Sequence, residues 1–162
     1  MALREIIHPP GGQRVRAEDL GLELARLMSR KRFDIILRIR HPKLDPAEIT
    51  AALGWEPHRS WKAGDQSSTP KGTKLPGIRS DGLWSCTFKY KGETDIADKF
   101  SLILDHLSLH ERLFDKLSKR GAEAALYVQL PGNTNIGDRL SWPILKKFVD
   151  LKIALEFEVF PK

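Results

Sequence analysis

The sequence predicts an α+β domain of two layers, with a mixed sheet of about four strands and helices packed mainly on one face. Four segments alternate apolar with other residues or are apolar throughout, and segments of helical period lie between them. Three of the four expected strands have one mixed or polar face, which is typical of a sheet covered by helices on one side only. A length of 162 residues suits a single core.

The first segment differs from the rest of the chain. After Pro-Pro-Gly-Gly at residues 9–12, apolar side chains recur at helical spacing at Leu20, Leu24, Leu27 and Met28. We therefore expect residues 1–31 to be a basic, helical N-terminal appendage, packed through its leucines on the domain or on a second subunit. Residues 32–162 are then expected to form one α+β domain.

The domain is expected to begin with a strand over residues 33–40, where Phe33, Ile35, Leu37 and Ile39 alternate with more polar neighbours. A short helix follows, because Asp45 is a good N-cap, Pro46 suits the first helical position and Gly54 supplies the stop.

Three further strands are expected over residues 84–90, 123–130 and 153–159. Between them, a long helix is expected to start at Asp95, bend near Ser108 and stop at Gly121, and a shorter helix to open at Ser141. The predicted core between sheet and long helix consists of Ile35, Leu37, Trp84, Phe88, Phe100, Leu104, Leu155 and Phe157.

The amino-acid sequence limits the kinds of metal site and the cellular location to be expected. The single cysteine, Cys86, permits no intramolecular disulfide and no cysteine-rich metal site. We find no signal peptide and no apolar run of about 20 residues. The expectation is a cytoplasmic protein that does not interact with membranes.

The net charge of +6 is concentrated in two segments. Residues 1–43 hold ten Lys and Arg against five acids, and residues 58–79 hold five against Asp65 alone. Such clusters attract nucleic acid or another polyanion. However, the sequence has neither a helix-turn-helix signature nor an RNP-like aromatic strand.

Residues 55–81 show no period and are expected to form a long loop, the segment where a binding site is predicted. Cations, an aromatic ring and a carboxylate are close together there, at His58, Arg59, Trp61, Lys62 and Asp65. Arg can pair with an anionic group and Trp can stack on a planar one. In the structural alternative, Trp61 anchors the loop and Asp65 caps a turn, and the exposed sheet face around Arg38, Lys89 and Glu156 becomes the candidate.

No catalytic residue, cofactor or metal ligand is predicted. His106 and His110 share one helix face at metal-binding spacing, but no further ligand completes a set, so two surface histidines are expected. Cys86 is expected to be a core residue rather than a nucleophile. No Gly-x-Ser-x-Gly, Walker or Rossmann motif is present.

Several short motifs carry a family resemblance: Pro57, Trp61-Lys62-Ala63-Gly64-Asp65, Gly82-Leu83-Trp84-Ser85, the leucine-rich helix and the closing strand with Phe157. With these, residues 33–160 resemble the bacterial family called domain of unknown function 4279 (DUF4279). The resemblance implies a shared small fold. It implies no catalytic residues, because the family is defined without an activity.

The preferred hypothesis is a non-catalytic binding or interaction protein that recognises a partner protein through residues 55–81. Binding of nucleic acid or another polyanion through the basic segments is the alternative, and an enzyme with a site not visible in the sequence is the second alternative. The sequence leaves the oligomeric state open.

Overall fold

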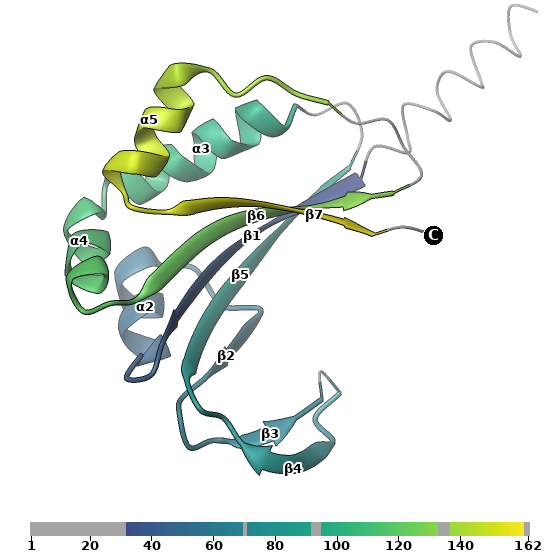
Figure 1. Ribbon diagram of the computed structural model, residues 1–162, viewed down its shortest axis with the longest axis vertical. Helices are drawn as coiled ribbons and strands as arrows, with labels where there is room; N and C mark the ends of the chain where they lie inside the picture. Colours follow the sequence, from purple (N-terminus) through teal and green to yellow (C-terminus); the bar gives the residue numbers. More distant parts are fainter. Residues whose placement is uncertain (1–31, 70, 92–94, 133–136, 161–162) are drawn as a thin grey trace, which may run out of the picture.

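The computed structural model describes residues 32–69, 71–91, 95–132 and 137–160 (Figure 1), and the helical appendage predicted over residues 1–31 lies outside them. The elements in chain order are β1 (Arg32–His41), α2 (Pro46–Leu53), β2 (Arg59–Trp61), β3 (Gln66–Ser68), β4 (Lys74–Ile78), β5 (Gly82–Lys91), α3 (Ile96–Ser108), α4 (Glu111–Lys119), β6 (Glu123–Pro131), α5 (Trp142–Asp150) and β7 (Ala154–Phe160).

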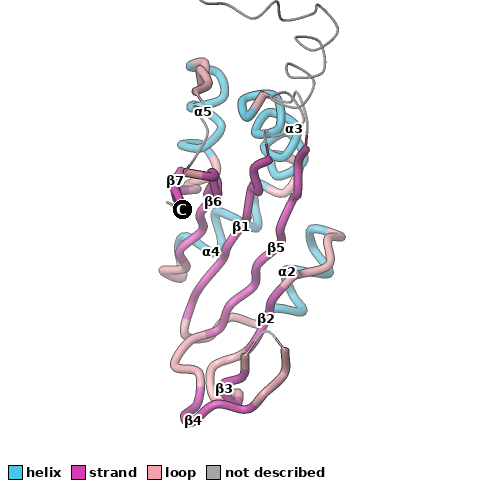
Figure 2. The backbone as a smooth tube through the Cα atoms, turned by 90° about the vertical axis from the view of Figure 1, so that its right-hand side faces the viewer, coloured by secondary structure: helices cyan, strands magenta, loops and turns pink. Residues whose placement is uncertain are grey.

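Five strands form the main sheet in the order β2-β5-β1-β6-β7, side by side in Figure 2. All pairs are antiparallel except β6 and β7, which are parallel because α5 crosses between them. The strands β3 and β4 form a separate two-stranded sheet. The predicted α+β class and mixed sheet are confirmed.

Alternation in β1 separates the two faces of the sheet. Ile35 and Leu37 are fully buried and pack with residues of the helices. Arg38 and Arg40 alternate with the buried residues along the strand, so their side chains lie on the other face. All described helices cover the first face in Figure 1. We call the opposite side, which no helix of the described chain covers, the open face.

The helix signals in the sequence are reproduced. Asp45 accepts a hydrogen bond from Ala47 N, and Gly54 ends α2 at a φ of 68°. The long helix bends where expected, since α3 ends at Ser108 and α4 begins at Glu111. None of the helices in the described ranges is long and apolar enough to span a membrane.

The predicted core is correct except at one edge. Five of its members are fully buried: Ile35, Leu37, Trp84, Phe100 and Leu104. Phe88 and Leu155 are partly buried against the same cluster. Phe157, in contrast, is 58% exposed, so its placement in the core was wrong. The reason is its position on β7, the outermost strand, where the cover provided by the helices ends.

The expectation of one irregular loop over residues 55–81 was also wrong, because β2, β3 and β4 lie within it. β2 is only three residues long and adds a fifth strand to the predicted sheet. Every residue of β4 is exposed, so the hairpin has no alternating apolar face for a sequence pattern to reveal.

Candidate functional site

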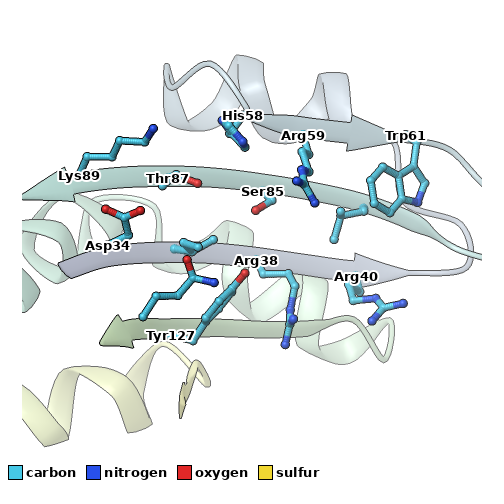
Figure 3. Close-up of a pocket in the computed structure, with 13 residues that line it drawn as sticks. Asp34, Arg38, Arg40, His58, Arg59, Trp61, Ser85, Thr87, Lys89 and Tyr127 are labelled. Carbon is cyan, nitrogen blue, oxygen red and sulfur yellow. The ribbon is translucent and has the colours of Figure 1, made fainter. Parts of the chain in front are cut away.

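A groove of about 380 Å³ crosses the open face (Figure 3). Its lining comes from four strands and the residue before β2: Asp34, Ile36, Arg38, Arg40, His58, Arg59, Trp61, Leu83, Ser85, Thr87, Lys89, Tyr127 and Gln129. Ile36 and Leu83 are buried and contribute apolar surface. The rest of the lining is polar or charged, apart from the aromatic rings of Trp61 and Tyr127.

Strand register explains why these side chains meet. Ile36 is paired with Thr87 on one side and with Tyr127 on the other. Arg59 of β2 is paired with Ser85 of β5. Residues that are far apart in the sequence therefore share one row, because paired residues project to the same face of a sheet.

Two of the four cations in the groove are already paired. Arg38 donates a hydrogen bond of 3.0 Å to Glu156 and lies 4.9 Å from the centroid of the Tyr127 ring. Arg40 pairs with Asp81 at 2.7 Å.

The other two cations, Arg59 and Lys89, are exposed. Neither forms an ion pair with any other residue that the structure describes. Their charges are therefore available to an incoming anion.

Hydroxyl groups lie between these charges. Ser85 is only 7% exposed, the one buried polar side chain of the described ranges. Burial raises the pKa of Tyr127, and the nearby Arg38 only partly opposes this effect. The phenol is thus neutral at pH 7 and can donate a hydrogen bond to a ligand.

The structure separates the five site residues predicted from the sequence. His58, Arg59 and Trp61 line the groove. Lys62 and Asp65 do not: Lys62 pairs with Asp45 at 3.1 Å, and the Asp65 carboxylate accepts a hydrogen bond of 2.7 Å from Lys62 N. Asp65 thus caps the turn after β2, as in the structural alternative, and the Lys62 side chain links this turn to the N-cap of α2.

The position of Trp61 fits both interpretations of this residue, as part of the binding site and as an anchor of the segment. It lines the groove, and the Arg79 guanidinium lies 4.0 Å from the centroid of its ring. Its Nε1 atom is buried without a hydrogen-bond partner in the described part of the chain. Trp61 therefore joins the groove to the β3–β4 hairpin.

The family model for Domain of unknown function (DUF4279) matches residues 31–160. The chain belongs to the DUF4279 family. The match includes every residue of the groove and leaves residues 1–30 outside. Comparison with curated proteins and with solved structures gives no match.

Two other sequence features lie away from the groove of this DUF4279 domain. His106 is not a free surface residue, because its Nε2 atom is 3.1 Å from Leu53 O and its ring stacks on Trp55 at 4.3 Å. His110 is 5.2 Å from it, ring to ring. Within the described ranges, no three side chains of His, Cys, Asp or Glu form a metal-binding group. Cys86 is buried in the core, which raises the pKa of its thiol.

Sequence reasoning missed the residues that complete the groove, above all Ser85, Thr87 and Tyr127. In the alternative site around Arg38, Lys89 and Glu156, Arg38 and Lys89 line the groove. The usable signal was the alternation in β1, whose polar positions mark the open face. The partner strands could not be aligned with β1 from alternation alone, because it leaves the register open.

Proposed function

We propose that this DUF4279 domain is a non-catalytic binding protein that recognises an acidic partner protein on its open face. The observation that carries the proposal is the pair of exposed cations Arg59 and Lys89, which have no ion-pair partner in the described ranges and lie beside the hydroxyl groups of the groove. A carboxylate there can accept charge-assisted hydrogen bonds, which are about twice as strong as neutral ones.

The charge balance of the groove supports an anionic ligand. Arg38, Arg40, Arg59 and Lys89 face a single lining carboxylate, Asp34. The ion pairs of Arg38 and Arg40 are partly exposed to solvent, so each contributes little to stability, about 0–1 kcal/mol. These two arginines can therefore also turn toward a ligand at low cost.

A binding role accounts for the arrangement better than catalysis does. His58 meets Ser85 through the backbone, its N–H donating to Ser85 O at 2.7 Å. A serine nucleophile instead needs the imidazole within hydrogen-bond reach of its hydroxyl. The neutral Tyr127 is likewise suited to donating a hydrogen bond rather than to acting as a base.

Nucleic acid is the second candidate, favoured by the four cations of the groove. Carboxylates interrupt this positive surface, since Asp34 lines the groove and Glu156 reaches Arg38 on the open face. A continuous phosphate backbone would meet both. Separate acidic side chains of a protein can avoid them, so the acidic partner is preferred.

Binding of fluorescent poly-L-glutamate to the full chain tests the proposal. The Arg59→Ala/Lys89→Ala double variant is expected to bind roughly tenfold more weakly, because two charge-assisted contacts are lost. A matched control, Arg112→Ala/Lys43→Ala, removes the same two charges from exposed positions outside the groove. It should bind normally.

Equal binding by both double variants would overturn the proposal. Tight binding of double-stranded DNA that depends on Arg59 and Lys89, without any binding of poly-L-glutamate, would instead establish the second candidate. Melting temperatures of all variants should remain close to that of the wild type, since exposed substitutions change stability by roughly 0.5 kcal/mol or less.

A further inference from the structure

Most of strand β5 has no strand partner on its outer side within the described ranges. β5 pairs with β1 along all ten residues, from Gly82 to Lys91. On its other side, β2 pairs only with residues 83–85. Figure 2 shows the rest of β5 extending beyond β2. Within the described structure, no strand pairs with residues 86–91 on this side.

The backbone groups at this edge can be assigned. Ser85 O accepts a hydrogen bond from His58 N, so Ser85 directs its backbone groups outward, away from β1. Directions alternate along an antiparallel strand, so Thr87 and Lys89 also point outward. Each offers one N–H and one C=O, and no described strand pairs with them.

The chain cannot easily cover this edge by extending β2. β2 begins at Arg59, opposite Ser85, and the chain just before it contains Pro57. Proline has no N–H to donate to the ladder. The chain instead passes from α2 toward β2 at this point.

The two sides of the edge differ in chemistry. On the open face, Thr87 and Lys89 line the groove together with Arg59, the first residue of β2. On the helix face, Phe88 is only partly buried and contacts Trp55 edge-on at 5.0 Å. Trp84, four residues earlier on the same strand, is fully buried and donates a hydrogen bond from its Nε1 atom to Thr50 of α2.

From this geometry we propose that the edge of β5 at Thr87 and Lys89 binds an extended segment of the acidic partner as an added antiparallel strand, in line with β2. This inference rests on the proposed function and specifies the form of the ligand. Backbone hydrogen bonds supply affinity in such complexes, and alternate side chains supply specificity.

Charge and apolar surface define that segment. Acidic side chains would alternate with apolar ones, the acids lying over Lys89 and Arg59 and the apolar groups on Trp55 and Phe88. An edge lysine also disfavours pairing with a second copy of the same edge, because two Lys89 side chains would approach each other. Lys89 therefore favours pairing with an acidic strand over pairing with the β5 edge of a second copy of the protein.

The probe is an eight-residue peptide of alternating glutamate and valine, acetylated and amidated, added to the full chain. Amide exchange at Thr87 and Lys89, followed by NMR, is expected to slow by about tenfold or more when the peptide pairs with them. A peptide with N-methyl groups on the pairing side should bind roughly tenfold more weakly, because it cannot donate its backbone hydrogen bonds.

A charge exchange tests the side-chain part. Lys89→Glu should abolish binding of the glutamate–valine peptide and restore binding to a lysine–valine peptide. Lys43→Glu, the same change at an exposed position outside the groove, should leave the original preference intact.

The possible failures are distinguishable. Binding that requires Arg59 but tolerates N-methylation and leaves exchange at Thr87 and Lys89 unchanged would overturn strand addition, while the proposed function would stand. Binding of neither peptide nor poly-L-glutamate, or binding independent of Arg59 and Lys89, would overturn both.

Discussion

The Arg79 guanidinium lies 4.0 Å from the centroid of the Trp61 ring, and this contact ties the β3–β4 hairpin to the end of β2. Arg79 also donates a hydrogen bond of 3.1 Å to Ser68 O, and its own carbonyl accepts one of 2.8 Å from Gly64 N. Backbone hydrogen bonds and the side chains of Gln66 and Arg79 hold the hairpin together, and every residue of β4 is exposed.

Removal of the Trp61 ring should lower stability. We expect Trp61→Ala to reduce the free energy of unfolding in urea by about 1–3 kcal/mol, because part-buried aromatic surface and the cation–π contact are lost. A double-mutant cycle with Arg79→Ala should give a coupling energy of about 0.5–1 kcal/mol. Additive effects would mean that the stacked geometry contributes nothing.

The long helix offers a matched pair of leucines. Leu104 is fully buried and Leu102 is 62% exposed on the same helix, α3. Leu104→Ala should lower the free energy of unfolding by about 2–5 kcal/mol, whereas Leu102→Ala should have almost no effect. Similar losses for the two variants in urea unfolding would show that the helix face is wrongly assigned.

Gly82, at the start of β5, is expected to tolerate no side chain. A Cβ atom there would lie 2.8 Å from Leu44 Cβ and 2.9 Å from Leu44 O. Gly82→Ala should therefore destabilise the protein by roughly 1–3 kcal/mol through overpacking. Gly137→Ala is the control, because a Cβ at Gly137 meets nothing within 4 Å. Thermal unfolding that does not distinguish these variants would contradict the close approach.

Single substitutions should separate the two roles of the segment after α2. Arg59→Ala should weaken binding of poly-L-glutamate, because Arg59 faces the groove without an ion pair in the described structure. Lys62→Ala should not, because Lys62 pairs with Asp45 away from the groove. The two variants lose the same charge, so a comparison of their dissociation constants shows which of the two residues contacts the ligand. A larger effect for Lys62→Ala would place the ligand on the other side of the turn.

Asp115 makes stability depend on pH in the acid range. Hydrogen bonds from Lys119 and Lys152 lower the pKa of Asp115 from its usual 3.8 to about 2. Because the pKa is lower in the folded state, the contribution is complete above about pH 4 and disappears as the pH falls toward 2. Asp115→Asn should therefore lower the melting temperature at pH 6 but not at pH 2. The same deficit at both pH values would rule out this carboxylate as the source.

Much of the fold was predictable because its signals are local. The alternation in β1 and the caps at Asp45 and Gly54 need only a few neighbouring residues to be read. The short strands β2, β3 and β4 have no such signal, and β2 forms only because β5 lies beside it. The placement of Phe157 in the core was wrong for a related reason, since alternation does not reveal which strand lies at the edge of the sheet.

The candidate site was only partly predictable. Arg59 and Trp61 were found because charge and aromatic residues gather within the segment. Tyr127 lies more than 60 positions further along the chain and reaches the groove through the register of β6 with β1. Lys62 and Asp65 belong to the same charged segment of the sequence, but the turn directs their side chains away from the groove. Composition can indicate which segment contains a binding site. The side chains that meet on one face, however, are determined by the register of the strands.

The central place of β1 also constrains how the chain can fold during synthesis. Leu37 is paired with Cys86 on one side and with Leu126 on the other, so the first strand of the domain to leave the ribosome waits longest for its second neighbour. Until β6 emerges, one edge of β1 has no strand to pair with. Contacts this distant in sequence slow folding and leave nascent chains prone to aggregation. Chaperone binding to the nascent chain should therefore end only after residue 131, when β6 is complete.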